Sequence, residues 1–359
     1  MKTILLAFTI KNGAVSSYFT ELAAEAVRRG YRVVIITDGQ KHALVDTTSN
    51  PVILTWPSPR PTRLRDALFL YRVIKQYKPV ISISIFGSIN LVTLVSFLTG
   101  VSRRWAWIRS LSKQFKQKKI HKWRKALVYR MTTRLIVNSK ATQKDALKNY
   151  GLNPRKLQVI YNAISLPARP PQRNIDTNKI TYAGRLHPSK GVDVLLKAFA
   201  RVAETCPRKK LYILGDGEQM KYLKKLAGEL GIANRVYFLG SVSHEEVLKH
   251  FSESLFVVTP SYYEAFGFVI IEAFSTGTPV IGGDAGGPSE IIRHKVDGYL
   301  FPPGDVKSLS GYMEDLCRHP QKAIKMGEQA FFRAQTTFEL KNVIRQVMDL
   351  IEEDLKNLS

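Results

Sequence analysis

Cysteine and acidic side chains are scarce in this sequence of 359 residues, and their distribution excludes several classes of protein. Cys206 and Cys317 are the two cysteines; they are far apart and lack metal-ligand spacing, which argues against a disulfide framework or a zinc site. An Asp-x-Asp pair occurs nowhere, and no acidic residue lies between Asp66 and Asp145. A secretory signal is not visible, because the apolar run after Met1 and Lys2 ends at residue 11 and predicts a first strand.

The scarcity of acid is confined to the first half of the chain. Residues 1–170 hold 30 Lys+Arg and 6 Asp+Glu, a formal charge of +24, whereas residues 171–359 carry +1. A field of this sign attracts nucleic acid, anionic lipid or an acidic acceptor. The asymmetry also predicts two domains with different partners.

Residues 80–102 form the longest uncharged stretch, and they raise the question of a membrane span. Scattered polar residues, among them Ser82, Asn90 and Thr99, together with Gly87, argue against one. We expect a buried strand followed by a buried helix.

Apolar strands alternate with helical patterns, which predicts an α/β fold with parallel, doubly wound sheets. A segment with three prolines, 166–176, separates the two halves as an extended linker. We expect an N-terminal domain at 1–165, a C-terminal domain at 166–337, and a last helix at 338–359 that packs back on the first domain. Ligands of such sheets bind beyond the carboxyl ends of the strands. The strands are expected at residues 3–8, 32–37, 80–86, 106–108, 134–137, 179–183, 210–214, 236–238 and 255–259.

Residues 260–290 place two carboxylates around a helix start. Glu264 precedes a helix predicted from Phe268, Glu272 lies within it, and Gly277 follows its end. A helix start favours phosphate, and a carboxylate beside it accepts hydrogen bonds from sugar hydroxyls. The pattern suits a nucleotide-sugar; the alternative is a solvent-facing pair of glutamates.

Two further loops follow predicted strands. In the first, Arg185 and Lys190 lie five residues apart, and the two cations can converge on one diphosphate, although basic loops are common. In the second, Gly215 and Gly217 flank one residue, a weak pattern that a tight turn explains equally well.

Together these motifs resemble the donor-binding elements of a large family of retaining glycosyltransferases, the family 4 type, which includes glycogen and sucrose synthases and bacterial polysaccharide transferases. The resemblance rests on Pro-Ser at 260–261, Glu-Ala-Phe-Gly-Phe at 264–268, Gly-Thr-Pro-Val at 277–280 and Gly-Arg-Leu…Ser-Lys-Gly at 184–191. It implies the GT-B fold, two Rossmann-like domains facing a central cleft. It further implies transfer of a hexose from a nucleotide diphosphate-sugar, with UDP-sugar the expected donor.

The resemblance also implies roles for individual residues. Arg185 and Lys190 bind the donor diphosphate, Glu264 the sugar hydroxyls and Glu272 the ribose, and catalysis falls to Glu264, Arg185 and Lys190. Without Asp-x-Asp, these cations are expected to neutralise the leaving group with no metal or other cofactor. The remaining expected donor contacts are Gly13, Ala14, Gly184, Gly215, Val242, Ala265, Phe266, Gly267 and Phe268.

The first domain departs from the family pattern in two places. Ala14 stands where relatives usually have a second glycine, which is tolerable if its φ is negative. Many relatives have a histidine at the end of a first-domain strand, but here the strand ends in Arg109. Arg109 either binds an acceptor phosphate or the donor sugar, which would make it a further catalytic candidate, or belongs to a basic surface.

A helix predicted at 116–131 would place Ile120, Trp123 and Leu127 on one face, flanked by lysines. This pattern is typical of a helix in an anionic membrane interface; the alternative is a core-facing stripe with a basic solvent side. We therefore expect a monomer or weak dimer attached to the inner face of the cytoplasmic membrane. Its acceptor would be an anionic glycan or a lipid-diphosphate-linked sugar of cell-surface polysaccharide or lipopolysaccharide synthesis.

Other functions remain open at this stage. A nucleotide-sugar epimerase would need carboxylates or histidines in the first domain, which offers few, and a phosphorylase would need a longer chain. A nucleic-acid-binding protein would explain the charge but not Arg185, Lys190, Glu264 and Glu272, and the sequence contains no recognisable RNA or DNA module.

Overall fold

The computed structural model describes residues 1–10, 13–38, 50–59, 63–114 and 119–356. It divides into two compact units, the first comprising Met1–Ala163 with Leu340–Ser359 and the second Ile164–Glu339. The proline-rich segment 166–176 lies at the start of the second unit. There, the guanidinium of Arg173 donates to the backbone carbonyls of Ser252 and Gly277 at 3.1 and 2.6 Å, which fixes this segment to the second unit.

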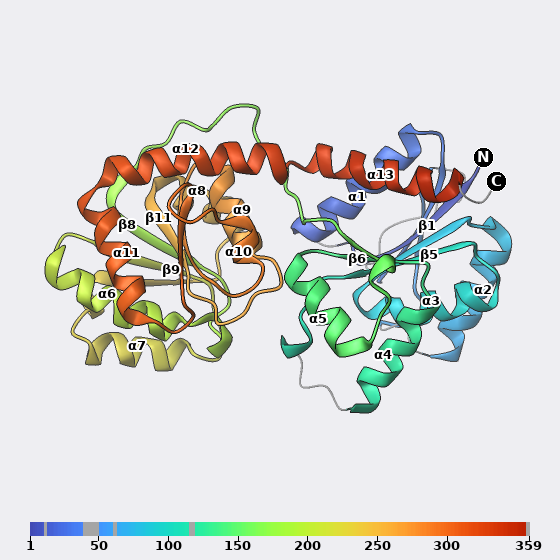
Figure 1. Cartoon of the computed structure of the whole chain (residues 1–359), viewed down its shortest axis with the longest axis horizontal. Helices are drawn as coiled ribbons and strands as arrows, with labels where there is room; N and C mark the ends of the chain where they lie inside the picture. Colours follow the sequence, from blue (N-terminus) through green and yellow to red (C-terminus); the bar gives the residue numbers. More distant parts are fainter. Residues whose placement is uncertain (11–12, 39–49, 60–62, 115–118, 357–359) are drawn as a thin grey trace. The chain divides into compact units, whose positions relative to one another are not determined.

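The first unit contains a sheet of parallel strands in the order β3-β2-β1-β4-β5-β6-β7 (Figure 1). The order reverses between β1 and β4, and this switch point is where open α/β sheets bind ligands. The sequence patterns did not predict β3 and β7, which have four and three residues. The strands are β1 (Thr3–Ala7), β2 (Arg32–Thr37), β3 (Val52–Thr55), β4 (Ile81–Ile85), β5 (Arg103–Ile108), β6 (Arg134–Val137) and β7 (Leu157–Val159).

The helices of the first unit settle two of the sequence questions. The uncharged stretch 80–102 forms β4 and helix α3 (Ile89–Leu98), which confirms a buried strand followed by a helix. The prediction that the helix is buried is correct for one face only, because Leu94, Phe97 and Leu98 are exposed. Among the residues described, no helix is both long and apolar enough to cross a membrane. The helix predicted at 116–131 is observed as α4 (Lys119–Met131), and residues 116–118 lie outside the described residues. The remaining helices of this unit are α1 (Ala14–Arg28), α2 (Leu64–Tyr77), α5 (Lys140–Tyr150) and α13 (Leu340–Lys356).

The outward face of α4 excludes one alternative. Ile120, Trp123 and Leu127 are exposed, whereas Val128 and Tyr129 of the same helix are buried. The core-facing interpretation of the apolar stripe is therefore wrong for these three side chains.

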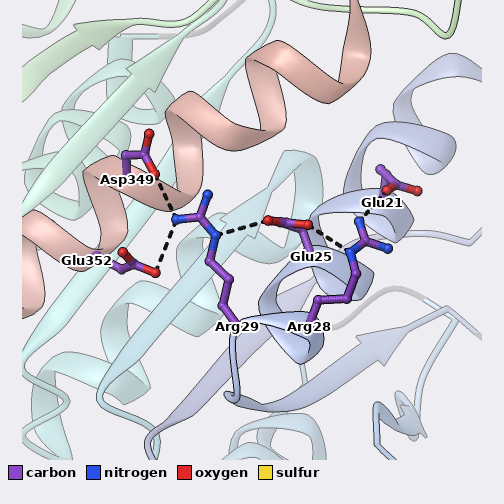
Figure 2. Close-up of polar contacts among 6 residues, drawn as sticks. All are labelled: Glu21, Glu25, Arg28, Arg29, Asp349 and Glu352. Carbon is purple, nitrogen blue, oxygen red and sulfur yellow. Dashed lines mark hydrogen bonds and ion pairs between the residues drawn. The ribbon is translucent and has the colours of Figure 1, made fainter.

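Helix α13 packs along α1 and completes the core of the first unit. Its apolar face, which includes Val347 and Ile351, is buried. Arg29, at the end of α1, reaches three carboxylates: Nε donates to Glu25 at 3.0 Å, and Nη1 contacts Asp349 at 2.7 Å and Glu352 at 3.2 Å (Figure 2). These exposed and half-buried pairs fix the orientation of α13 more than they stabilise it.

A buried carboxylate fixes the other end of α13. Asp354 is 8% exposed and accepts hydrogen bonds from the indole Nε1 of Trp105 at 2.9 Å and from Nε of Arg134 at 3.1 Å. The Nε of Arg103 donates to the backbone carbonyl of Asp354 at 2.9 Å. Removal of α13 would leave buried donors of β5 and β6 unpaired, so the helix is an integral part of the first unit.

The second unit is built around a parallel sheet in the order β10-β9-β8-β11-β12-β13. Its order reverses between β8 and β11, so its switch point lies at the carboxyl ends of those strands. The strands are β8 (Asp176–Ala183), β9 (Lys210–Leu214), β10 (Val236–Gly240), β11 (Ser254–Thr259), β12 (Val280–Gly283) and β13 (Gly298–Phe301).

Helices cover both faces of this sheet (Figure 1). Cys206 and Cys317 are free thiols that belong to one hydrophobic core, and burial raises the pKa of the Cys317 thiol to about 12. The helices are α6 (Val192–Thr205), α7 (Met220–Glu229), α8 (His244–Glu253), α9 (Phe268–Ser275), α10 (Pro288–Ile291), α11 (Val306–Arg318) and α12 (Pro320–Thr337).

Candidate functional site

The switch point of the second unit gathers the strongest sequence motifs. Residues 184–191 follow β8 and residues 260–267 follow β11, and these two strands are neighbours in the sheet. The backbone N–H of Tyr262 donates to the carbonyl of Ser189 at 2.9 Å, which joins the two loops. Motifs whose key residues, Lys190 and Glu264, are 74 positions apart in sequence thus lie at one sheet edge because both follow parallel strands.

A lysine–glutamate pair is the central feature of this edge. The ammonium of Lys190 donates to Oε2 of Glu264, with the two side chains 29% and 20% exposed. The backbone of Glu264 is also fixed, because its N–H donates to the carbonyl of Ala285 at 2.9 Å and its carbonyl accepts from the N–H of Gly287 at 3.0 Å. The carboxylate is therefore positioned from both sides and already bound to a cation.

Arg185 lies in the same loop as Lys190 and has a different environment. Its side chain is exposed, and within the described ranges it forms no ion pair. The phenol of Tyr182 donates to its backbone carbonyl at 3.0 Å and fixes the start of the loop. The structure thus offers a solvent-facing guanidinium beside a partly buried ammonium, and an anionic ligand can approach the guanidinium without displacing a protein carboxylate.

Close backbone packing explains the glycines around this loop. A Cβ at Gly215 would lie 2.0 Å from the carbonyl oxygen of Gly184, and one at Gly217 would lie 2.4 Å from that of Leu186. The N–H of Gly215 donates to the carbonyl of Gly240 at 2.7 Å. The loops after β8, β9 and β10 therefore interlock, and this packing requires both glycines of the Gly-x-Gly turn whether or not they contact a ligand.

Helix α9 begins where the sequence predicted. Gly267 precedes it with φ 116°, a conformation that favours glycine. Ala265 and Phe266 are buried, so any contact of these two residues with a ligand comes from their backbone. The Phe266 ring packs against Phe268, at a centroid distance of 5.9 Å. This apolar packing holds the start of α9 in place, four residues after Glu264.

Glu272 lies on α9 and is largely buried. Its side chain is 13% exposed, and burial raises the pKa of its carboxyl above the ordinary value, opposed by His244. The imidazole Nδ1 of His244 lies 3.8 Å from Oε1 of Glu272. Hydrogen-bond donors on a ligand, such as a ribose diol, would stabilise the ionised form of Glu272.

Sequence reasoning did not single out His244. It is the first residue of α8, which follows the loop containing Val242, and Val242 itself is half-buried. Ser243 accepts from the N–H of Glu246 while Glu246 accepts from that of Ser243. The Ser-x-x-Glu spacing is a capping box visible in the sequence, and it could have located His244 at a helix start.

The first unit holds the other expected residues. Gly13 precedes α1 with φ 139°, and Ala14 is the first residue of that helix and has no positive φ, as its methyl group requires. Arg109 is 8% exposed and lies 5.9 Å from the ring centroids of both Tyr18 and Phe19. Burial lowers the pKa of its guanidinium to about 10.

Arg109 is therefore not part of a basic surface, and that alternative is wrong. It lines a pocket of about 310 Å³ with Asn90 of α3, Trp107 of β5 and Lys125 of α4. The pocket belongs to the first unit alone. Among the described residues, no three His, Cys, Asp or Glu side chains gather as ligands of a metal would.

Two family models match the chain. The one described as "Glycosyl transferases group 1" matches residues 168–332, and the one described as "Glycosyltransferase Family 4" matches residues 13–166.

Three curated relatives show different coverage. The glycosyltransferase MJ1607 of Methanocaldococcus jannaschii is 26% identical over 83% of each chain. An exopolysaccharide phosphotransferase of Streptomyces coelicolor is 34% identical over 61% of this chain, and a D-inositol 3-phosphate glycosyltransferase of Rhodococcus erythropolis is 33% identical over 55%. The chain spans only 23% and 48% of the length of these last two proteins.

Solved structures share the fold over the full length. The structure of Anabaena Alr3699/HepE in complex with UDP and glucose matches with a TM-score of 0.79, at 21% identity, over 98% of this chain and 100% of that one. Sucrose-phosphate synthase from Thermosynechococcus elongatus matches with a TM-score of 0.79 at 20% identity, over 100% of both chains.

Proposed function

This chain belongs to the glycosyltransferases that the two family models describe, and we propose that it transfers a hexose from UDP-sugar with retention at the anomeric carbon. The observation that carries the proposal is the pair of Lys190 and Glu264 at the switch point, with the exposed Arg185 in the same loop. Cations for a diphosphate and a carboxylate for hydroxyls thus lie at one sheet edge.

Each side chain has a defined task in the proposed reaction. Arg185 and Lys190 bind the diphosphate and stabilise the charge that grows on it as the bond to the sugar breaks, at about 1.5–3 kcal/mol for each charge-assisted hydrogen bond. Glu264 accepts hydrogen bonds from sugar hydroxyls, and Glu272 accepts them from the ribose. The two cations do the work that a metal does in other transferases, so we propose that the enzyme needs no divalent ion.

The bond changes follow from the absence of an assigned protein base or nucleophile. The acceptor hydroxyl attacks the anomeric carbon on the face that the diphosphate leaves. Its proton passes to an oxygen of the departing diphosphate, so one carbon–oxygen bond forms while another breaks. The product keeps the configuration of the donor.

Charge supports an anionic acceptor. The first half of the chain carries +24, and Arg109 and Lys125 line a pocket in the first unit. One relative is named for an inositol phosphate acceptor and another for exopolysaccharide chemistry. We propose an acceptor with a phosphate or diphosphate group, either lipid-linked or part of a glycan, and attachment of the enzyme to the cytoplasmic leaflet.

Calorimetric titration with UDP in the presence of EDTA tests the donor site. We expect binding without metal and at least about tenfold weaker binding by R185Q and by K190Q, since each loses a charge-assisted bond. K210Q is the matched control, because Lys210 is exposed at the start of β9, far along the strand from the site. Binding only after Mg²⁺ or Mn²⁺ is added, or equal affinity of all four proteins, would refute the assignment.

Product analysis tests the reaction class. Proton NMR of the hexose first released by slow hydrolysis of UDP-glucose should show the α-anomer. Release of the β-anomer would exclude retention.

Activity that disappears after nuclease treatment would favour a nucleic-acid partner.

A further inference from the structure

Three neighbouring helices of the first unit expose apolar side chains at helical spacing. On each helix the second and third exposed residues lie three, four or seven positions after the first, so the three form one outward stripe. Their exposures run from 39% to 77%. The stripes are Leu64, Leu68 and Tyr71 on α2, Leu94, Phe97 and Leu98 on α3, and Ile120, Trp123 and Leu127 on α4.

The opposite faces of these helices are buried. Leu70 and Val73 of α2 and Val92 and Val95 of α3 share one hydrophobic core, and Val128 of α4 is in another. The outward stripes are therefore not needed to hold the helices on the sheet. A soluble protein gains no folding energy from a leucine that stays in water, so nine such side chains on adjoining helices indicate a partner.

The helices adjoin one another in the order α2, α3, α4. Contacts join α2 to α3 and α3 to α4, and α3 lies between the other two in Figure 1. The three stripes therefore form one surface, which we call the three-helix face and define by the nine residues above.

Charge on these helices has one sign. Their sequences contain eight Lys+Arg and a single acid, Asp66. Asp66 is buried and accepts from the backbone N–H of Arg63 at 2.9 Å, so it caps its own helix. Exposed cations, including Arg72 of α2 and Arg124 of α4, accompany the apolar stripes.

We propose that the three-helix face docks on a lipid bilayer with anionic headgroups, its apolar stripes entering the interface while the surrounding cations meet lipid phosphates. This rests on the proposed attachment of the enzyme to the cytoplasmic leaflet, for which the sequence indicated α4 alone, and it adds α2 and α3 to the contact. A bilayer fits the combination because it offers apolar depth and a continuous negative surface together. A bilayer is fluid, so it can accommodate these leucine and aromatic side chains without a surface of complementary shape.

The pocket that contains Arg109 shares two of these helices. Asn90 of α3 and Lys125 of α4 line it, and Phe86, at its edge, is 52% exposed with φ 52°. A left-handed backbone at an exposed phenylalanine is strained and marks a functional segment more often than a neutral one. Docking on the three-helix face therefore keeps this pocket close to lipid headgroups.

Vesicle flotation tests the proposal with full-length protein. The variants are L64Q/L68Q on α2, F97Q/L98Q on α3 and I120Q/W123Q on α4, and the matched control is F332Q, an exposed aromatic on α12 of the second unit. With vesicles of phosphatidylcholine and phosphatidylglycerol, each double variant should lower the partition coefficient at least about tenfold. F332Q should bind as the unmodified protein does, and pure phosphatidylcholine should recover less of every protein.

Other results overturn the proposal in distinguishable ways. Loss of binding for the α4 variant only would keep the membrane attachment but remove α2 and α3 from it. Equal recovery on neutral and anionic vesicles would refute the role of charge. Self-association in sedimentation velocity that the variants abolish would instead identify the face as an interface between two copies. UDP affinity, measured in parallel, should be the same in all variants as in the unmodified protein. Failure of the unmodified protein to bind UDP would refute the proposed function itself.

Discussion

Glu264 and Lys190 bind each other as well as the proposed donor. We therefore predict that removing the charge of Glu264 raises the affinity for UDP while it lowers the rate of turnover. In the unliganded protein the ammonium of Lys190 is bound to the carboxylate of Glu264. A diphosphate must compete with that carboxylate, whereas a sugar must find the carboxylate available. The substitution E264Q keeps the size of the side chain and removes its charge.

We therefore expect E264Q to bind UDP more tightly and to turn over UDP-glucose more slowly. With exposures of 29% and 20%, the pair lies between surface pairs, worth about 0.2–1 kcal/mol, and buried charges, whose isolation costs about 3–5 kcal/mol. Release of Lys190 should then contribute about 1–2 kcal/mol, or roughly 5- to 30-fold in affinity for UDP. Loss of the hydrogen bonds to the sugar should lower turnover by about tenfold or more.

Calorimetry with UDP and a coupled assay of UDP-glucose turnover measure the two effects. E253Q is the matched control, because Glu253 pairs with Lys179 at 2.6 Å near the amino end of β8, away from the switch point. E253Q should leave UDP affinity unchanged. If E264Q bound UDP no better than the unmodified protein, Lys190 would not be a ligand of the diphosphate, and the assignment of the site would fail.

Three further predictions concern the burial of Glu272, the packing of Gly215 and the attachment of α13. Folding favours the protonated form of Glu272, because burial raises the pKa of its carboxyl above the ordinary value of 4.5. The unmodified protein should therefore lose stability relative to E272Q as the pH rises above 4.5, which thermal unfolding between about pH 4 and 8 measures. E272Q should also bind UDP more weakly. G215A should lower the unfolding midpoint and UDP affinity, since its Cβ would meet the carbonyl of Gly184 at 2.0 Å, whereas G228A, with nothing within 4 Å, should be neutral or slightly stabilising. D354N should lower the free energy of unfolding in urea by about 2–3 kcal/mol, because it weakens the hydrogen bonds that Asp354 accepts from the Arg134 guanidinium and from the Trp105 indole. E353Q, on the exposed side of α13, should leave that free energy unchanged. An unchanged urea midpoint for D354N would show that α13 is held by its apolar face alone.

Local pattern determined the strands and helices that lie in the core. Short apolar runs predicted β1, β2 and β9, and the glycine after Thr276 marked the end of α9, because these signals act within a few residues. The same is true of the site motifs, since Arg185, Lys190 and Glu264 each follow a strand. Parallel strands of one sheet bring their carboxyl ends to one edge, so the sequence alone indicated that these residues lie at the same sheet edge.

Burial and pairing were decided by tertiary structure. Nothing local shows that Arg109 is buried against Tyr18 and Phe19, or that Ile120 and Trp123 face outward, because the side of a helix that meets the core depends on its neighbours. The pairing of Lys190 with Glu264 is likewise a property of two loops, since these residues are 74 positions apart in the sequence. The sequence therefore determined which chemical groups reach the sheet edge, and the packing of distant segments decided which of those groups are buried, paired or left to meet a partner.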